Sequence, residues 1–115
     1  MNRLSPKVHG MLDYVTVILL ALSPSLFNMQ GYATIFTCSL AFVHLMLTLF
    51  TNFKMGMFPV IPLRIHGIIE IWVSVLLVVV SFLFLMYSDV VSFYFYLIFA
   101  IVLFIVWLLS DYSFG

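Results

Sequence analysis

Charged side chains are scarce in this chain: four basic and four acidic residues stand among 115, and the formal net charge is zero. Charged residues make up 7% of the chain, whereas soluble domains contain about 25%. So few charges cannot cover a water-exposed surface, and without a basic run there is no nucleic-acid-binding patch. Because 66% of the residues are hydrophobic, we expect the lipid bilayer to be the main solvent.

Cysteine is almost absent, and recognisable catalytic motifs are missing. The single Cys38 excludes an intramolecular disulfide and leaves the redox compartment undetermined. The sequence contains no Ser/His/Asp or Cys/His constellation and no phosphate-binding loop, so we expect a protein that is not an enzyme. The first hydrophobic run holds Asp13 and no small-residue cleavage site, which favours a retained first helix over a signal peptide.

Four long apolar runs fill most of the chain. Each is close to the roughly 20 residues that an α-helix needs to cross a hydrocarbon core of about 30 Å. Lipid cannot satisfy backbone polar groups, so helices are the expected structure of these runs. We predict an all-α integral membrane four-helix bundle with spans at about residues 7–26, 32–50, 63–86 and 90–109.

The positions of the cations predict an orientation. Arg3 and Lys7 precede the first span, Lys54 and Arg64 flank the second connection, and the opposite side carries Asp89. The positive-inside rule then places both termini in the cytoplasm. We expect Lys7, Lys54 and Arg64 to contact lipid headgroups.

A seven-residue phrase occurs twice. KVHGMLD at residues 7–13 returns as RIHGIIE at residues 64–70, a shift of 57 residues from His9 to His66. Each copy reads cation, apolar, His, Gly, two apolar, carboxylate, and each opens a hydrophobic run. The ends TNFKMG at 51–56 and SDYSFG at 110–115 also match. We interpret the chain as one domain built from two tandem two-helix repeats, residues 1–57 and 58–115, related by an axis along the membrane normal.

Further short motifs accompany this repeat. Ser23 and Pro24 end the first span, and a Thr-Asn-Phe triplet at residues 51–53 closes the second. With the duplicated cation-x-His start, this layout resembles the SPW-repeat family of small bacterial membrane proteins over nearly the whole chain. The sequence departs from the family at Ser25, where the signature has Trp. The resemblance implies a bacterial inner-membrane protein, and it transfers no established activity.

Two His–carboxylate pairs are the main candidates for a site. His9 and Asp13 are four residues apart and share a helical face, as do His66 and Glu70. A carboxylate at their depth costs about 1–3 kcal/mol if it faces lipid. We therefore expect both acids to face the bundle interior, each with the His one turn away as its natural partner.

Three interpretations of these pairs remain open. They could tie the helices together at the cytoplasmic end, with Gly10 and Gly67 allowing close backbone approach. They could relay or conduct a proton or ion, or hold a lipid headgroup. They could also form a metal site, because two His and two carboxylates (His9, Asp13, His66, Glu70) suit a transition metal.

His44 is a further ionisable residue deep in the second span. Haem held by two His needs both at one depth, and His44 lies about 10 Å along the helix axis from His9 and His66, taking a rise of 1.5 Å per residue. His9 and His66 could still pair, but they lie at the membrane edge, so we do not expect haem. One hypothesis is that His44 and Thr48 form a polar track toward Asp13 and Glu70. Small and polar residues at helical spacing predict the inward faces: Thr34, Thr37, Ala41, His44, Thr48 and Thr51; Gly67, Glu70, Ser74 and Ser81; Gly10, Asp13, Val17 and Ala21.

The fourth span is rich in aromatic residues. Tyr94 and Tyr96 near one end and Trp107 near the other fit interfacial belts. The same aromatic area could instead dock another membrane protein or a second copy of the chain. Our leading expectation for function is a structural, accessory or immunity-type interaction protein of the inner membrane. The alternative is a protein that binds or conducts a proton, a metal or a lipid headgroup through the His–acid pairs.

Overall fold

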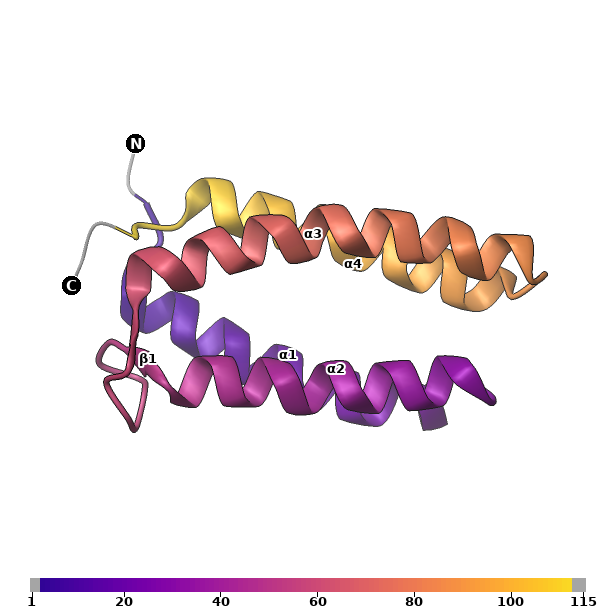
Figure 1. Cartoon of the computed structure of the whole chain (residues 1–115), viewed down its shortest axis with the longest axis horizontal. Helices are drawn as coiled ribbons and strands as arrows, with labels where there is room; N and C mark the ends of the chain where they lie inside the picture. The colour runs from indigo at the N-terminus through magenta and orange to yellow at the C-terminus, as the bar shows by residue number, and fades with distance from the viewer. Residues whose placement is uncertain (1–2, 113–115) are drawn as a thin grey trace.

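The chain folds into four helices joined by short turns (Figure 1). A computed structural model describes residues 3–112, so part of the second matching end, residues 113–115, lies outside the described residues. The predicted helix bounds agree with the observed ones to within one residue. All four helices are long and apolar enough to cross a membrane. In chain order the elements are α1 (Pro6–Leu26), α2 (Tyr32–Leu49), β1 (Thr51–Asn52), β2 (Ile61–Pro62), α3 (Leu63–Met86) and α4 (Val90–Leu109).

Local sequence explains where two of the helices begin. The Ser5 hydroxyl accepts a hydrogen bond from the Val8 N–H at 3.3 Å, and the proline that follows Ser5 has no N–H to lose in the first turn. Asp89 is the N-cap of α4, and its carboxylate accepts from the Ser92 N–H at 3.1 Å. The turns of the two hairpins use positive φ angles at Asn28 (52°), Gly31 (54°) and Ser88 (63°).

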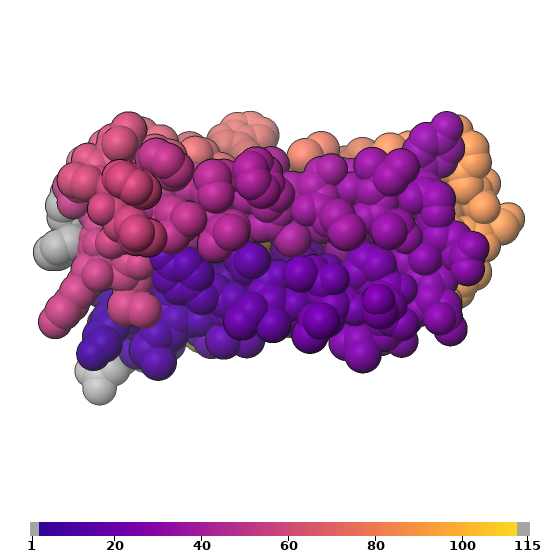
Figure 2. All heavy atoms as spheres, turned by 90° about the horizontal axis from the view of Figure 1, so that it is seen from below, coloured from indigo at the N-terminus to yellow at the C-terminus, as the bar shows by residue number. Residues whose placement is uncertain are grey.

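The helices pair as two hairpins, α1–α2 and α3–α4, which lie in two layers (Figure 1). Figure 2 shows α1 and α2 side by side along the length of one face. Between the hairpins, a groove of about 540 Å³ runs between α1 and α4. A second groove, of about 1000 Å³, lies between α2 and α3. The helices of the two hairpins therefore contact each other through side chains at particular places.

One such place is an aromatic core toward the end that holds the hairpin turns. Tyr96 is fully buried there, between Phe36 and Phe84, and its hydroxyl is hydrogen-bonded to that of Thr37. The prediction that Tyr96 belongs to an interfacial belt is therefore wrong, because this ring faces α2 and α3 in the interior. Tyr94, two residues earlier, is exposed.

The opposite end holds the β1–β2 connection and the first and last described residues (Figure 1). Thr51 and Asn52 pair in parallel with Ile61 and Pro62. Leu4 pairs in parallel with Ser110, its N–H donating to the Leu109 carbonyl at 2.7 Å. The sequence did not predict these two pairings, which hold Thr51 and Ser110 beside the first turns of α3 and α1.

The predicted inward faces are mostly correct. Thr37 and Thr48 are buried on α2, and His44 is half-buried. On α1 the prediction is wrong at Ala21, which is exposed, while Leu20 is completely buried in its place. In the C-terminal half of α1, the face that contacts the other helices is therefore shifted by one residue, from Ala21 back to Leu20.

Candidate metal site

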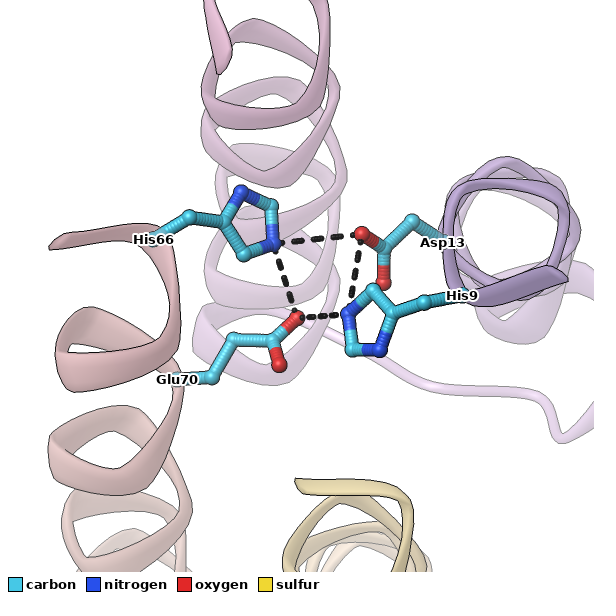
Figure 3. A group of neighbouring side chains, drawn as sticks. All are labelled: His9, Asp13, His66 and Glu70. Atoms are coloured by element: carbon cyan, nitrogen blue, oxygen red, sulfur yellow. Dashed lines mark hydrogen bonds and ion pairs between the residues drawn. The ribbon is translucent and has the colours of Figure 1, made fainter. Parts of the chain in front are cut away.

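The two His–carboxylate pairs meet in one buried cluster between the hairpins (Figure 3). His9 and Asp13 extend from α1, and His66 and Glu70 extend from the first two turns of α3. None of the four residues is more than 3% exposed. The sequence predicted the pairing within each helix and left open whether the two pairs contact each other.

Nitrogen and oxygen atoms alternate around a closed ring of four contacts (Figure 3). The Nε2 atom of His9 lies 2.9 Å from Glu70 Oε1 and 3.3 Å from Asp13 Oδ2. The Nε2 atom of His66 lies 3.0 Å and 3.2 Å from the same two oxygens. Each imidazole therefore contacts both carboxylates, and the four atoms all lie within 4.8 Å of one another.

The ring orientation of His9 is fixed by a hydroxyl on the far side of the imidazole. Ser110 Oγ lies 2.6 Å from His9 Nδ1, and the same hydroxyl donates to the Val106 carbonyl at 2.6 Å. The hydroxyl has one hydrogen, and the carbonyl accepts it, so its oxygen must accept from the Nδ1–H of His9. His9 Nε2 is therefore the nitrogen that faces the two carboxylates.

His66 is held in the same way by the other hairpin. Thr51 Oγ1 lies 2.7 Å from His66 Nδ1 and donates its hydrogen to the Leu47 carbonyl at 2.5 Å. His66 Nδ1 thus carries a hydrogen, and its Nε2 also faces the cluster centre. In metal sites, an imidazole ligand usually has its second nitrogen bonded in this manner, which fixes the tautomer and the ring plane.

Asp13 Oδ2 is the unsatisfied atom of the cluster. It is buried and receives no hydrogen bond from any residue between 3 and 112. The Nε2 atoms of His9 and His66 lie 3.3 Å and 3.2 Å from it, but in neutral imidazoles whose hydrogen is on Nδ1 they have no hydrogen to donate. A buried acceptor without a donor costs about 1–3 kcal/mol. A cation between the four atoms would contact Asp13 Oδ2 together with the other three.

The outer oxygens of the two carboxylates have different neighbours. Tyr112 donates its phenolic hydrogen to Glu70 Oε2 at 2.5 Å. Burial, and after it the negative charge of Glu70, raises the pKa of the Tyr112 phenol, which therefore stays protonated. On the other acid, Asp13 Oδ1 lies 3.6 Å from His44 Nε2, beyond a normal hydrogen-bond length.

Two glycines allow aromatic rings to cover the cluster. A Cβ atom on Gly67 would lie 2.8 Å from Cγ of Tyr112, and one on Gly10 would lie 2.7 Å from Cε2 of Phe53. The Tyr112 ring centroid is 5.3 Å from that of His9, and Phe53 is 6.2 Å from His66. The atoms nearest to both glycines all belong to side chains, so the glycines permit the close approach of covering side chains rather than the expected approach of backbone.

The size of the ring of contacts fits a four-coordinate ion. An ion equidistant from four atoms with edges of 2.9–3.3 Å would lie about 1.9 Å from each in a tetrahedron and about 2.2 Å in a square. Zn–N and Zn–O bonds of about 2.0–2.2 Å fall in this interval. The donor set of two imidazoles and two carboxylates also suits a first-row transition metal.

The secondary candidates do not join the four ligand atoms. The Thr48 hydroxyl donates to the His44 carbonyl at 2.9 Å, and the Ser74 hydroxyl donates to the Ile71 carbonyl at 2.9 Å. Both hydroxyls satisfy their own helices, so the track through Thr48 is not formed by these contacts. His44 approaches the cluster through Asp13 Oδ1.

Lys7, Lys54 and Arg64, the predicted headgroup contacts, are all exposed. They belong to the first turn of α1, to the β1–β2 connection and to the first turn of α3. They therefore lie at the same end of the bundle as the cluster, but on the surface rather than among the buried residues.

Sequence reasoning missed Thr51, Ser110 and Tyr112 as parts of the site. The signal was the match between the segments that begin at Thr51 and Ser110, which the sequence suggested only as helix ends. Comparison with known families, curated proteins and solved structures finds no match to this chain.

Proposed function

We propose that this chain is a non-enzymatic membrane protein that binds one divalent transition-metal ion, of the zinc class, between its two hairpins. The convergence of four acceptor atoms carries this proposal, since Ser110 and Thr51 turn the Nε2 atoms of His9 and His66 toward the same point. Sites with four protein ligands and no open position are typical of structural zinc. The ion would join α1 to α3 and so hold the hairpins together.

With both imidazoles neutral, as metal ligands are, charge balance calls for a divalent ion. Asp13 and Glu70 bring two negative charges into the cluster, and neutral imidazoles bring none. An unbalanced charge is very costly in a low-dielectric interior. A divalent cation makes the site neutral, and it also gives Asp13 Oδ2 a partner.

We place this protein in a bacterial inner membrane with both termini in the cytoplasm. The four apolar helices support membrane insertion. The exposed Lys7, Lys54 and Arg64 near the end that holds the cluster support the orientation, because cations concentrate on the cytoplasmic side. The metal site would then lie near the cytoplasmic surface.

We also propose that the two halves arose by duplication, as the resemblance to the SPW-repeat family implies. Matching contacts support this. Thr51 at the end of the first half holds His66, while Ser110 at the end of the second half holds His9. A duplicated two-helix unit would supply one imidazole and one carboxylate from each copy.

The test is metal content and metal-dependent stability of the protein purified in detergent. We expect about one zinc ion per chain and a higher melting temperature with zinc than with chelator, because a ligand that binds the folded state stabilises it. The double variant Asp13→Asn, Glu70→Gln should lose both effects and stay helical. Asp89→Asn, an acid-to-amide change at the other end of the bundle, should retain both.

A well-folded protein that neither retains zinc nor responds to it would contradict the proposal. The cluster would then be a purely structural joint, with both imidazoles protonated and paired with the two carboxylates.

A further inference from the structure

The two oxygens of the Glu70 carboxylate have separate partners. Oε1 faces the cluster centre, 2.9 Å and 3.0 Å from the two Nε2 atoms, and Oε2 accepts the Tyr112 hydroxyl at 2.5 Å. A bidentate carboxylate would turn both oxygens toward one ion. Glu70 could do so only by giving up the bond from Tyr112.

Tyr112 is itself held in place, so its hydroxyl cannot follow a turning carboxylate. Its ring packs on Gly67, where even a Cβ atom would lie within 2.8 Å of it, and its edge-on contact with His9 places the centroids 5.3 Å apart. The segment just before it is anchored by the pairing of Ser110 with Leu4.

Resting on the proposed function, we infer that Tyr112 determines the metal selectivity of the site by keeping Glu70 monodentate. With one oxygen from each acid and one nitrogen from each imidazole, the ion is four-coordinate, which suits Zn²⁺. Mn²⁺ prefers octahedral coordination rich in oxygen, which bidentate carboxylates help to supply. The Tyr112 hydroxyl therefore disfavours Mn²⁺ without touching the ion.

Asp13 has no equivalent restraint among the described contacts. Its outer oxygen lies 3.6 Å from His44 Nε2. In the first half of the chain, the position that corresponds to Tyr112 is Phe53, which has no hydroxyl to bond Asp13. Selectivity should therefore depend on Tyr112 far more than on His44.

The experiment compares Tyr112→Phe with the unchanged protein, using Co²⁺ as a spectroscopic probe and competition between Zn²⁺ and Mn²⁺. Tyr14→Phe is the matched control, because the Tyr14 hydroxyl donates to the Met55 carbonyl at 2.8 Å and does not bond the cluster. Four-coordinate Co²⁺ absorbs visible light strongly and six-coordinate Co²⁺ weakly.

We expect intense four-coordinate Co²⁺ bands in the unchanged protein and in Tyr14→Phe. Tyr112→Phe should weaken these bands and reduce the preference for Zn²⁺ over Mn²⁺ by about tenfold, the lower end of effects from outer-shell partners. The change between variants is decisive, because Zn²⁺ outcompetes Mn²⁺ at most sites.

The same Co²⁺ spectrum and Zn²⁺/Mn²⁺ ratio in Tyr112→Phe as in the unchanged protein would overturn the inference and leave the metal site standing. A six-coordinate spectrum in the unchanged protein would overturn it without any variant. If the unchanged protein binds neither Co²⁺ nor Zn²⁺, the proposed function itself fails.

Discussion

The hydroxyl of Ser110 lies 2.6 Å from Nδ1 of His9, which is 101 residues earlier in the chain. Thr51 stands in the same relation to His66 at 2.7 Å. The end of each hairpin thus orients the imidazole at the start of the other. This exchange makes the cluster a property of the assembled bundle, since neither hairpin holds its own His in place.

Ser110→Ala should weaken zinc binding by about 10- to 100-fold, because outer-shell partners of metal-bound imidazoles typically contribute this much. Ser81→Ala is the control. Ser81 is also buried and donates to a carbonyl of its own helix, at 2.6 Å, but does not contact a His. Zinc affinities would be measured by competition with a chelating dye. Equal affinities in the two variants would show that Ser110 does not support zinc binding.

Acid should weaken zinc binding. Protons compete with the ion for the Nε2 atoms of His9 and His66 and for both carboxylates. At low pH the ion must therefore displace protons in order to bind. We expect the affinity to drop by at least about tenfold per pH unit once the imidazoles are protonated. Titrations at several pH values would measure this slope, and a pH-independent affinity would argue against imidazole ligands.

Gly67→Ala should destabilise the protein by about 1–3 kcal/mol, the usual cost of forcing extra atoms into a packed site. The added Cβ would lie 2.8 Å from Tyr112 Cγ, so the ring and its bond to Glu70 would have to move. Ile68→Ala, at the neighbouring exposed position, is the comparison. Melting temperatures in detergent would measure both, and a Gly67→Ala protein as stable as the original would contradict the packing described here.

Tyr96→Phe should affect stability without affecting metal binding. The variant loses the hydrogen bond to Thr37 at the aromatic end, at a cost of about 1 kcal/mol, and keeps the ring contacts with Phe36 and Phe84. We expect a lower melting temperature and an unchanged zinc affinity. A large loss of affinity would mean that the two ends of the bundle are coupled.

Much of the fold could be predicted from the sequence because long apolar helices carry a strong local signal. Apolar runs of sufficient length gave the four helices to within one residue, and the i, i+4 spacing placed His9 with Asp13 and His66 with Glu70. These relationships lie within one helix, so the sequence contains them directly.

The remainder depends on contacts between distant segments. Helical periodicity relates residues within one helix. It does not predict that His9 contacts Glu70 across the bundle, or that Ser110 orients His9. The short parallel pairing of Leu4 with Ser110 is too brief to leave a strand pattern. Tyr96 was misplaced because an amphipathic ring suits both an interface and a core in which its hydroxyl finds a partner.

Zinc K-edge X-ray absorption of the purified, zinc-loaded protein tests the central claim most directly. The proposed site predicts four nitrogen and oxygen ligands at about 2.0–2.2 Å, with the outer-shell scattering of two imidazoles and no sulfur. A spectrum with fewer than two imidazoles, or with sulfur ligands from the exposed Cys38, would contradict a zinc ion held by His9, Asp13, His66 and Glu70.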